Sequence, residues 1–448
     1  MINSADSRAE YILFKLFAGL IALFSIAIIV TSTFSDFRVT IFILLIICSL
    51  CLVITTRNNV ILFVISFVIA YSNYSAGLVN TFPPYYGYET IYSSAPVSAL
   101  GMSLLLLFVS SLLVFMPTAI KPVGDIGVFD RWKDVRYSSI LVIAVAAALM
   151  IIFVTCSSGF AVGSTGRADN NSIFEYAYIL FIFGFMIAGQ DKTLRTIMLA
   201  VAMLYLAQVF LGGNRASGLA IVLLLFVLFF ANKVNWLKLI PYLLLGFLML
   251  VSLGYFRSSD TFFLFRLFDA LNTLCKTGGV WDTASYAFHQ SIAFLRLDEV
   301  IGLDEKIYLI KQWIISWFIG SGAVPDSALA TYCQALYPGM GGGFLPLYAY
   351  FYFGLPGVLV ASGLIAWLFK KISLLCDTKS DLMFCISLSV STTCCRWYIY
   401  SPAPLTSSVF FISIVYIFLQ LFLVKKPHNT ERKSIDKLPV NKRGRYRS

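Results

Sequence analysis

Charged side chains are scarce in this sequence. Asp, Glu, Lys and Arg make up 12% of its 448 residues, whereas 59% are hydrophobic and the mean hydropathy is +0.85. So few charges cannot keep such an apolar chain dispersed in water, which excludes a soluble globular protein. We therefore expect an integral membrane protein.

Histidines and clustered metal ligands are scarce as well. The chain has two histidines, and most of its nine cysteines fall in or beside apolar runs, where they act as small apolar fillers. No Cys/His cluster has the spacing of a metal site, so we expect neither a metal nor another cofactor. Cys275 and Cys333 lie in a more polar segment, and their spacing alone does not show whether they pair.

The hydrophobic residues form long continuous runs. Each has roughly 16 to 24 residues, close to the ~20 that cross a ~30 Å hydrocarbon core as a helix. Continuous runs are typical of helices, whereas the strands of a membrane barrel alternate. The sequence thus predicts an all-α polytopic membrane protein with about twelve transmembrane helices. These are 11–31, 39–56, 60–78, 97–117, 139–158, 172–190, 196–211, 216–231, 239–255, 344–367, 381–399 and 403–424.

Lys and Arg indicate the orientation, because basic residues are retained in cytoplasmic loops. With a cytoplasmic N-terminus, about two thirds of the 33 basic residues fall inside, and both termini are cytoplasmic. The net charge of +11 then reflects topology and a basic tail near anionic lipid, without nucleic-acid binding. The predicted organisation is nine helices over 1–256, a large outer loop over 257–343, three helices over 344–424 and a cytoplasmic tail over 425–448.

The outer loop has apolar residues at helical spacing, which predicts short amphipathic helices. The stretch from Tyr308 to Ile319 carries Trp313 and Trp317 and is too short to span the bilayer. It is typical of a helix lying in the membrane surface. The alternative is a helix packed on the rest of the loop.

A polar stripe precedes that stretch. Four side chains fall within roughly 80° on a helical wheel, namely Asp282, Tyr286, His289 and Arg296. An acid, a phenol, an imidazole and a guanidinium on one face could hold a sugar, orient a base and bind phosphate. His289 is the candidate general base, and Asp282 and Asp326 are alternative catalytic groups. An ordinary solvated helix face is the other interpretation.

Arginines at the outer ends of the spans run against the usual distribution of positive charge. A polyanionic ligand at the outer leaflet would explain them together, because guanidinium matches phosphate oxygens in a bidentate geometry. For each arginine the alternative is an interfacial position or a structural ion pair. The candidate phosphate or pyrophosphate ligands are Arg215, Arg396, Arg167, Arg257 and Arg296, with Arg38 more exposed.

Three short motifs add a family resemblance. They are the turn 212–216 (Gly-Gly-Asn-Arg-Ala), the run 341–344 (Gly-Gly-Gly-Phe) and the segment 353–357 (Phe-Gly-Leu-Pro-Gly). Together with the twelve-span layout and the large outer loop, they resemble the O-antigen and polysaccharide polymerases of the Wzy type. Tyr348 lies where many members carry an acid, so that acid's catalytic role does not carry over, and Tyr348 is a candidate substrate contact.

The resemblance implies a metal-independent glycosyltransferase at the periplasmic face of the bacterial inner membrane. Such an enzyme joins oligosaccharide repeat units linked to undecaprenyl pyrophosphate into O-antigen or a related polysaccharide. Membrane lipid and a polysaccharide chain-length regulator are the implied partners.

Three rival functions remain open at this point. An O-antigen ligase uses the same donor, and His289 would suit its base. A lipid-oligosaccharide flippase or transporter is expected to show repeated halves, and no convincing repeat is visible here. A scaffolding membrane protein would not need the outward arginines.

Overall fold

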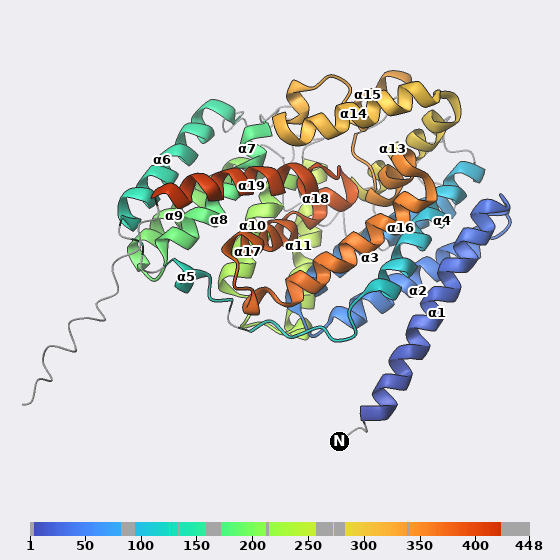
Figure 1. Cartoon of the computed structure of the whole chain (residues 1–448), viewed down its shortest axis with the longest axis horizontal. Helices are drawn as coiled ribbons and strands as arrows, with labels where there is room; N and C mark the ends of the chain where they lie inside the picture. Colours follow the sequence, from blue (N-terminus) through green and yellow to red (C-terminus); the bar gives the residue numbers. More distant parts are fainter. Residues whose placement is uncertain are drawn as a thin grey trace, which may run out of the picture.

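The computed structural model describes residues 4–81, 95–124, 126–132, 135, 137–157, 172–211, 215–256, 272, 283–337 and 341–422. The elements assigned within these ranges are helices (Figure 1). They are α1 (Ser4–Val30), α2 (Arg38–Thr56), α3 (Val60–Thr81), α4 (Ala95–Phe115), α5 (Val128–Arg131), α6 (Ser138–Cys156), α7 (Ser172–Tyr176), α8 (Tyr178–Ala188), α9 (Lys192–Leu211), α10 (Arg215–Phe229), α11 (Trp236–Phe256), α13 (Thr283–Val300), α14 (Leu303–Ile319), η1 (Ser321–Ala323), α15 (Leu329–Leu336), α16 (Leu345–Ser373), η2 (Leu375–Asp377), α17 (Asp381–Thr392), α18 (Cys394–Ile399) and α19 (Ala403–Phe422).

Within the described ranges, eight helices are long and apolar enough to cross a membrane: α1, α2, α3, α4, α6, α9, α16 and α19. Four shorter apolar segments, 173–188, 218–229, 236–246 and 381–392, coincide with the other expected spans. The all-helical, polytopic architecture is therefore confirmed. The number of twelve spans stays a prediction.

Helices α3 and α4 form the centre of the bundle. Their spanning windows are 78% and 89% buried, against 33% for α1 and α2 and 28% for α6, whose apolar side chains face outward. Helix α4 packs against α1, α2 and α16. Two of its buried serines, Ser103 and Ser110, are satisfied within the helix, because they donate to the carbonyls of Ala99 and Leu106 one turn earlier.

Helix α13, which falls in the expected outer loop, packs into the bundle against α3, α4, α16 and α18. Most of its residues are buried. Ser285 and Ser75 of α3 share a 2.7 Å hydrogen bond between their hydroxyls. A Cβ atom at Gly101 of α4 would lie 3.0 Å from the ring of Phe288, so the glycine lets α13 approach closely. Most of α13 is therefore packed against protein, and only a small part of it is a solvated helix face.

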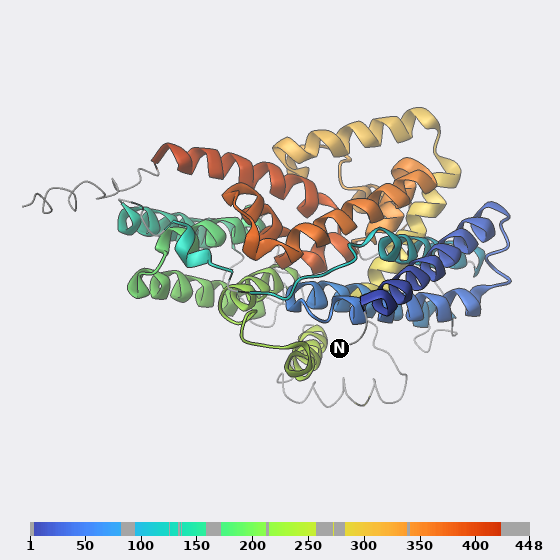
Figure 2. The same cartoon turned by 60° about the horizontal axis from the view of Figure 1, so that its bottom comes forward.

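Helix α14 lies along one edge of the bundle in both views (Figures 1 and 2). Trp313 stacks on Tyr352 of α16 at 4.8 Å, and Phe318 meets Phe410 of α19 at 5.1 Å. Phe318 is itself exposed and lies on the side of the helix away from Trp313, together with the exposed Ile307, Ile314, Ile315 and Ile319. The inner face of α14 packs on membrane helices, and its exposed apolar face is what a helix in the membrane surface requires.

Several apolar helices are interrupted. Helix α16 breaks at Gly354, whose φ of 64° and ψ of −156° are non-helical, two residues before Pro356. A Cβ at Gly357 would come 2.3 Å from the carbonyl oxygen of Ala349, so the turns around this break pass very close together. Milder one-residue interruptions separate α7 from α8 at Ala177, which keeps helical dihedral angles (φ −56°, ψ −24°), and α17 from α18 at Thr393 (φ −101°, ψ 15°). Broken helices in membrane proteins are common where polar groups gather.

Several loops that the distribution of Lys and Arg predicts to lie on the cytoplasmic side are close together in the structure. Asn59 donates to the carbonyl of Lys121 at 2.9 Å, and the Lys121 ammonium pairs with Asp377 at 2.7 Å. Gln190 donates to Asp130 at 2.9 Å. The ends of α2, α4, α8 and α16 therefore meet at one end of the bundle, as alternating crossings require.

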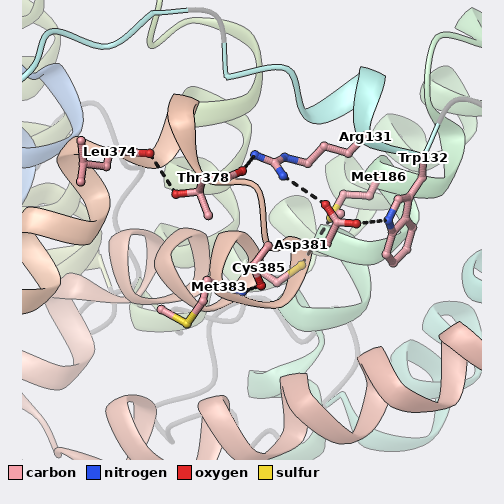
Figure 3. A network of polar contacts seen from close by, with 9 residues as sticks. Arg131, Trp132, Met186, Leu374, Thr378, Asp381, Met383 and Cys385 are labelled. Carbon is pink, nitrogen blue, oxygen red and sulfur yellow. Dashed lines mark hydrogen bonds and ion pairs between the residues drawn. The ribbon is translucent and has the colours of Figure 1, made fainter.

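A tighter cluster, the Asp381 cluster, consists of Arg131, Trp132 and Asp381 at the same end (Figure 3). One oxygen of Asp381 accepts from Arg131 at 3.1 Å, and the other accepts from the Trp132 indole at 2.9 Å. Arg131 also donates to the carbonyl of Thr378 at 2.7 Å and lies 3.9 Å from the centre of the Phe384 ring. This cluster ties α5 to the beginning of α17.

Replacing Asp381 by Asn should destabilise the protein by about 2 kcal/mol, because Arg131 would keep a largely buried charge without its carboxylate. Thermal unfolding in one fixed detergent measures the loss. Asp377→Asn is the matched control: its pair with Lys121 is well exposed, so that change should cost less than about 0.5 kcal/mol. Equal unfolding temperatures for the two variants would contradict the role of the cluster.

Candidate functional site

An ion pair lies at the opposite end of α17–α18 from the Asp381 cluster. Arg396 of α18 donates from one Nη to a carboxylate oxygen of Glu175 on α7. The two side chains are only 16% and 18% exposed. A charge pair enclosed among apolar helices is costly to desolvate, which makes it the default candidate for a functional site.

Two aromatic side chains that directly follow Arg396 hold α18 in place. Trp397 donates from its indole to the carbonyl of Val390 at 2.9 Å. Tyr398 donates to the side-chain oxygen of Asn73 on α3 at 2.7 Å, and both aromatic residues are buried. The backbone that carries Arg396 is thus fixed between α17 and α3.

The helix that carries Glu175 is fixed by the preceding residue. Phe174 stacks on Tyr205 of α9 with 4.8 Å between ring centres, and Tyr205 donates to the carbonyl of Leu149 on α6 at 2.6 Å. After the break at Ala177, Tyr178 shares hydrogen bonds with Ser408 at 2.6 Å and Ser389 at 3.2 Å. Helices α7, α8, α17 and α19 therefore converge around the Glu175–Arg396 pair.

Arg396 retains capacity to bind an anion. A guanidinium has five N–H donors, and the hydrogen bonds found in the described part of the chain use one of them for a side-chain acceptor. The neighbouring polar groups include the phenols of Tyr176 and Tyr178, and an ordinary phenol carries no charge at neutral pH. Among the side chains that the structure describes here, the site therefore presents one positive group, Arg396, balanced by Glu175.

Helix α10 brings a second predicted residue toward this end. It begins at Arg215 and packs against α17 and α18. Its far end carries Val227 and Leu228, which line a small cavity beside Asp130 and Gln190 at the Asp381 end. The start of α10, with its partial positive charge, therefore lies at the same end of the bundle as α18. The side chain of Arg215 lies outside the described residues.

His289 and Tyr286 are half-buried on α13. Burial lowers the pKa of His289 to about 4, so its imidazole is neutral near pH 7. A neutral imidazole can accept a proton, but so low a pKa makes it a weak general base, since efficient bases have a pKa near the working pH.

The other predicted residues have partners of their own. Tyr348 is buried and donates to the carbonyl of Tyr400 at 3.1 Å. Arg296 pairs with Glu299 one turn along α13 at 2.9 Å, and the exposed Asp326 accepts from Tyr308 at 3.1 Å. Their roles in a site stay predictions, and Arg396 differs from them in being part of an enclosed ion pair.

Four predicted or discussed residues lie outside the described part of the chain: Asp282, Arg167, Arg257 and Cys275. Cys333, in contrast, is a buried free thiol on α15. The glycine run over 341–343 serves helix packing: Gly343 donates to the carbonyl of Ile399 at 3.2 Å, and a Cβ at Gly342 would lie 3.1 Å from the same oxygen.

Sequence reasoning did not find Glu175. The residue lies 221 positions from Arg396, so no local spacing connects them. Its one visible signal is an acid at the beginning of the apolar run 172–190, where an unpaired carboxylate would be costly. Comparisons of the chain with protein-family models, with curated proteins and with solved structures find no match.

Replacing Arg396 alone should be worse than replacing both partners. Arg396→Gln leaves Glu175 enclosed without its counter-charge, which we expect to cost about 3 kcal/mol of stability. The double variant Glu175→Gln with Arg396→Gln has a neutral amide pair and should regain most of that loss in thermal unfolding. A double variant as unstable as Arg396→Gln would show that the two charges are not coupled.

His289 should make stability depend on pH in mildly acid solution. Its pKa is lower in the folded protein than in the unfolded chain, so the unfolded state binds a proton first as the pH falls from about 6.5 toward 4. Stability is complete above this window and decreases within it, by at most about 1.4 kcal/mol per pH unit. His289→Gln should flatten this part of the profile of unfolding temperature against pH, and an unchanged slope would contradict it.

Proposed function

We propose that this multi-pass membrane protein is a glycosyltransferase of the Wzy type. It joins oligosaccharide repeat units linked to undecaprenyl pyrophosphate into a longer polysaccharide. The observation that carries the proposal is Arg396, enclosed within the bundle with one of its five donors bound to a carboxylate. It lies on a helix that packs against α10, which begins at Arg215. A guanidinium in such a site suits the oxygens of a pyrophosphate.

The chemistry needs a leaving group, a nucleophile and a proton acceptor. A hydroxyl of the incoming repeat unit attacks the anomeric carbon of the growing glycan, and the bond from that carbon to the lipid pyrophosphate breaks. Arg396 and Arg215 stabilise the negative charge that develops on the departing pyrophosphate. The hydroxyl proton passes to a base, for which His289 is the candidate. Since burial weakens this base, most of the driving force comes from the activated leaving group.

The proposed orientation places the Asp381 end in the cytoplasm and the Glu175–Arg396 pair toward the periplasm of the bacterial inner membrane. The excess of Lys and Arg on the first side supports it. Residues 257–343 then belong to the periplasmic side, with α14 in the membrane surface. A polysaccharide chain-length regulator is the proposed protein partner there.

An O-antigen ligase is the second candidate. In this proposal Arg396 of the Glu175–Arg396 pair binds the pyrophosphate of the donor, and both enzymes use that donor. His289 on α13 would suit the base of a ligase as well. A flippase, in contrast, would change no covalent bond in its substrate.

The test is a reconstituted reaction. Purified protein in lipid vesicles receives lipid-pyrophosphate-linked repeat units without nucleotide, metal or ion gradient. We expect longer glycans and release of lipid pyrophosphate. Arg215→Lys keeps the charge but loses the planar fork, so the rate should fall by about 10²-fold. His289→Ala should slow the reaction by about 10²- to 10⁴-fold if the imidazole is the base.

Arg57→Lys is the control for the loss of a guanidinium, because Arg57 is exposed at the Asp381 end. Its rate should equal that of the wild type. Adding a lipid A core as a second acceptor separates the two enzymes, since a ligase would glycosylate that core in preference to another repeat unit. Repeat units that change sides of the vesicle without any lengthening would support a flippase and refute the proposal.

A further inference from the structure

Arg396 is occupied before any ligand arrives. Its Nη donates to the Glu175 carboxylate, and both side chains are less than one fifth exposed. A phosphate group that binds Arg396 must therefore share the guanidinium with a carboxylate or displace it. The question arises for Arg396 because, among the described residues around the pair, the other polar groups are neutral hydroxyls and Arg396 is the cation that Glu175 meets.

Charge decides between sharing and displacement. A pyrophosphate ester brings at least two negative charges to a place that is largely screened from water. Like charges held close together in such surroundings repel much more strongly than in solvent. Even with Arg215 of the proposed site beside Arg396, two positive groups face at least three negative charges once the pyrophosphate joins Glu175, so the carboxylate and the pyrophosphate compete for Arg396.

The geometry allows the carboxylate to yield. Glu175 reaches Arg396 through one hydrogen bond at the end of a flexible side chain, so rotation of that side chain is enough to release the guanidinium. Arg396, in contrast, is carried by a helix that Trp397 and Tyr398 fix to α17 and α3. The anion site therefore stays in place while its occupant changes.

We propose that Glu175 is a specificity residue that acts as an internal competitor for Arg396. In the empty site it neutralises Arg396. Pyrophosphate-linked donors, with two or more charges, displace it, whereas the singly charged phosphodiesters of surrounding membrane lipids do not. After transfer the carboxylate returns to Arg396 and helps to expel the lipid pyrophosphate. This inference rests on the proposed function for its substrate.

The first measurement is binding of inorganic pyrophosphate to full-length protein in phosphatidylcholine vesicles. Glu175→Gln keeps the shape and removes the charge, so it should bind pyrophosphate about tenfold more tightly than the wild type. Glu175→Asp draws the carboxylate back by one methylene and should give a smaller gain. Adding Arg396→Gln to Glu175→Gln should abolish the gain, which assigns it to this site. Asp377→Asn, which removes a carboxylate from the exposed pair with Lys121, should bind like the wild type.

The second measurement is glycan elongation in the same vesicles. With Glu175→Gln, both the KM for the lipid-linked repeat unit and kcat should fall, because substrate and released lipid pyrophosphate are both held more tightly. Replacing part of the phosphatidylcholine by phosphatidylglycerol should inhibit Glu175→Gln and leave the wild type unaffected.

The outcomes separate this inference from the proposed function. Unchanged or weaker pyrophosphate binding by Glu175→Gln and Glu175→Asp, with elongation intact in the wild type, would overturn the inference and make Glu175 a residue that merely positions Arg396. Elongation that is absent from the wild type would overturn the proposed function. The binding comparison would still decide whether Glu175 competes with anions for Arg396.

Discussion

The arrangement of α17 and α18 depends on the compensation of charge inside an apolar bundle. Removing an ionic side chain from water costs several kcal/mol, so each enclosed charge needs a counter-charge on a neighbouring helix. Asp381 meets Arg131 at the beginning of α17, and Arg396 meets Glu175 on α18. This segment of the chain is therefore fixed at both ends, and the position of the anion site follows from these two pairs.

Interruptions of the helices make room for the polar groups between those pairs. Helices α7 and α8 are separated by Ala177 and helices α17 and α18 by Thr393, and the hydroxyls of Tyr178, Ser389 and Ser408 meet nearby. A membrane helix can be broken when protein groups satisfy the freed donors and acceptors. The same breaks hold Glu175 and Arg396 on short helices whose flanking residues fix their direction.

The membrane helices could be predicted from the sequence to within a few residues. The expected span 39–56 corresponds to α2 (Arg38–Thr56), and 139–158 corresponds to α6 (Ser138–Cys156). Hydropathy is a sum over neighbouring residues, so the sequence of each apolar segment is sufficient to locate its helix. The packing of α13 was not predictable in this way, because its burial depends on Gly101 and Ser75, which belong to other helices.

The sequence by itself determined that this is a polytopic helical membrane protein, and it selected Arg396 as an arginine in need of an explanation. Only the tertiary structure decided what Arg396 meets. It showed Glu175 as its partner and gave Tyr348, Arg296 and Asp326 contacts of their own. The physical reason is distance along the chain: apolar runs act locally, whereas an ion pair between residues 221 positions apart exists only after the helices have packed.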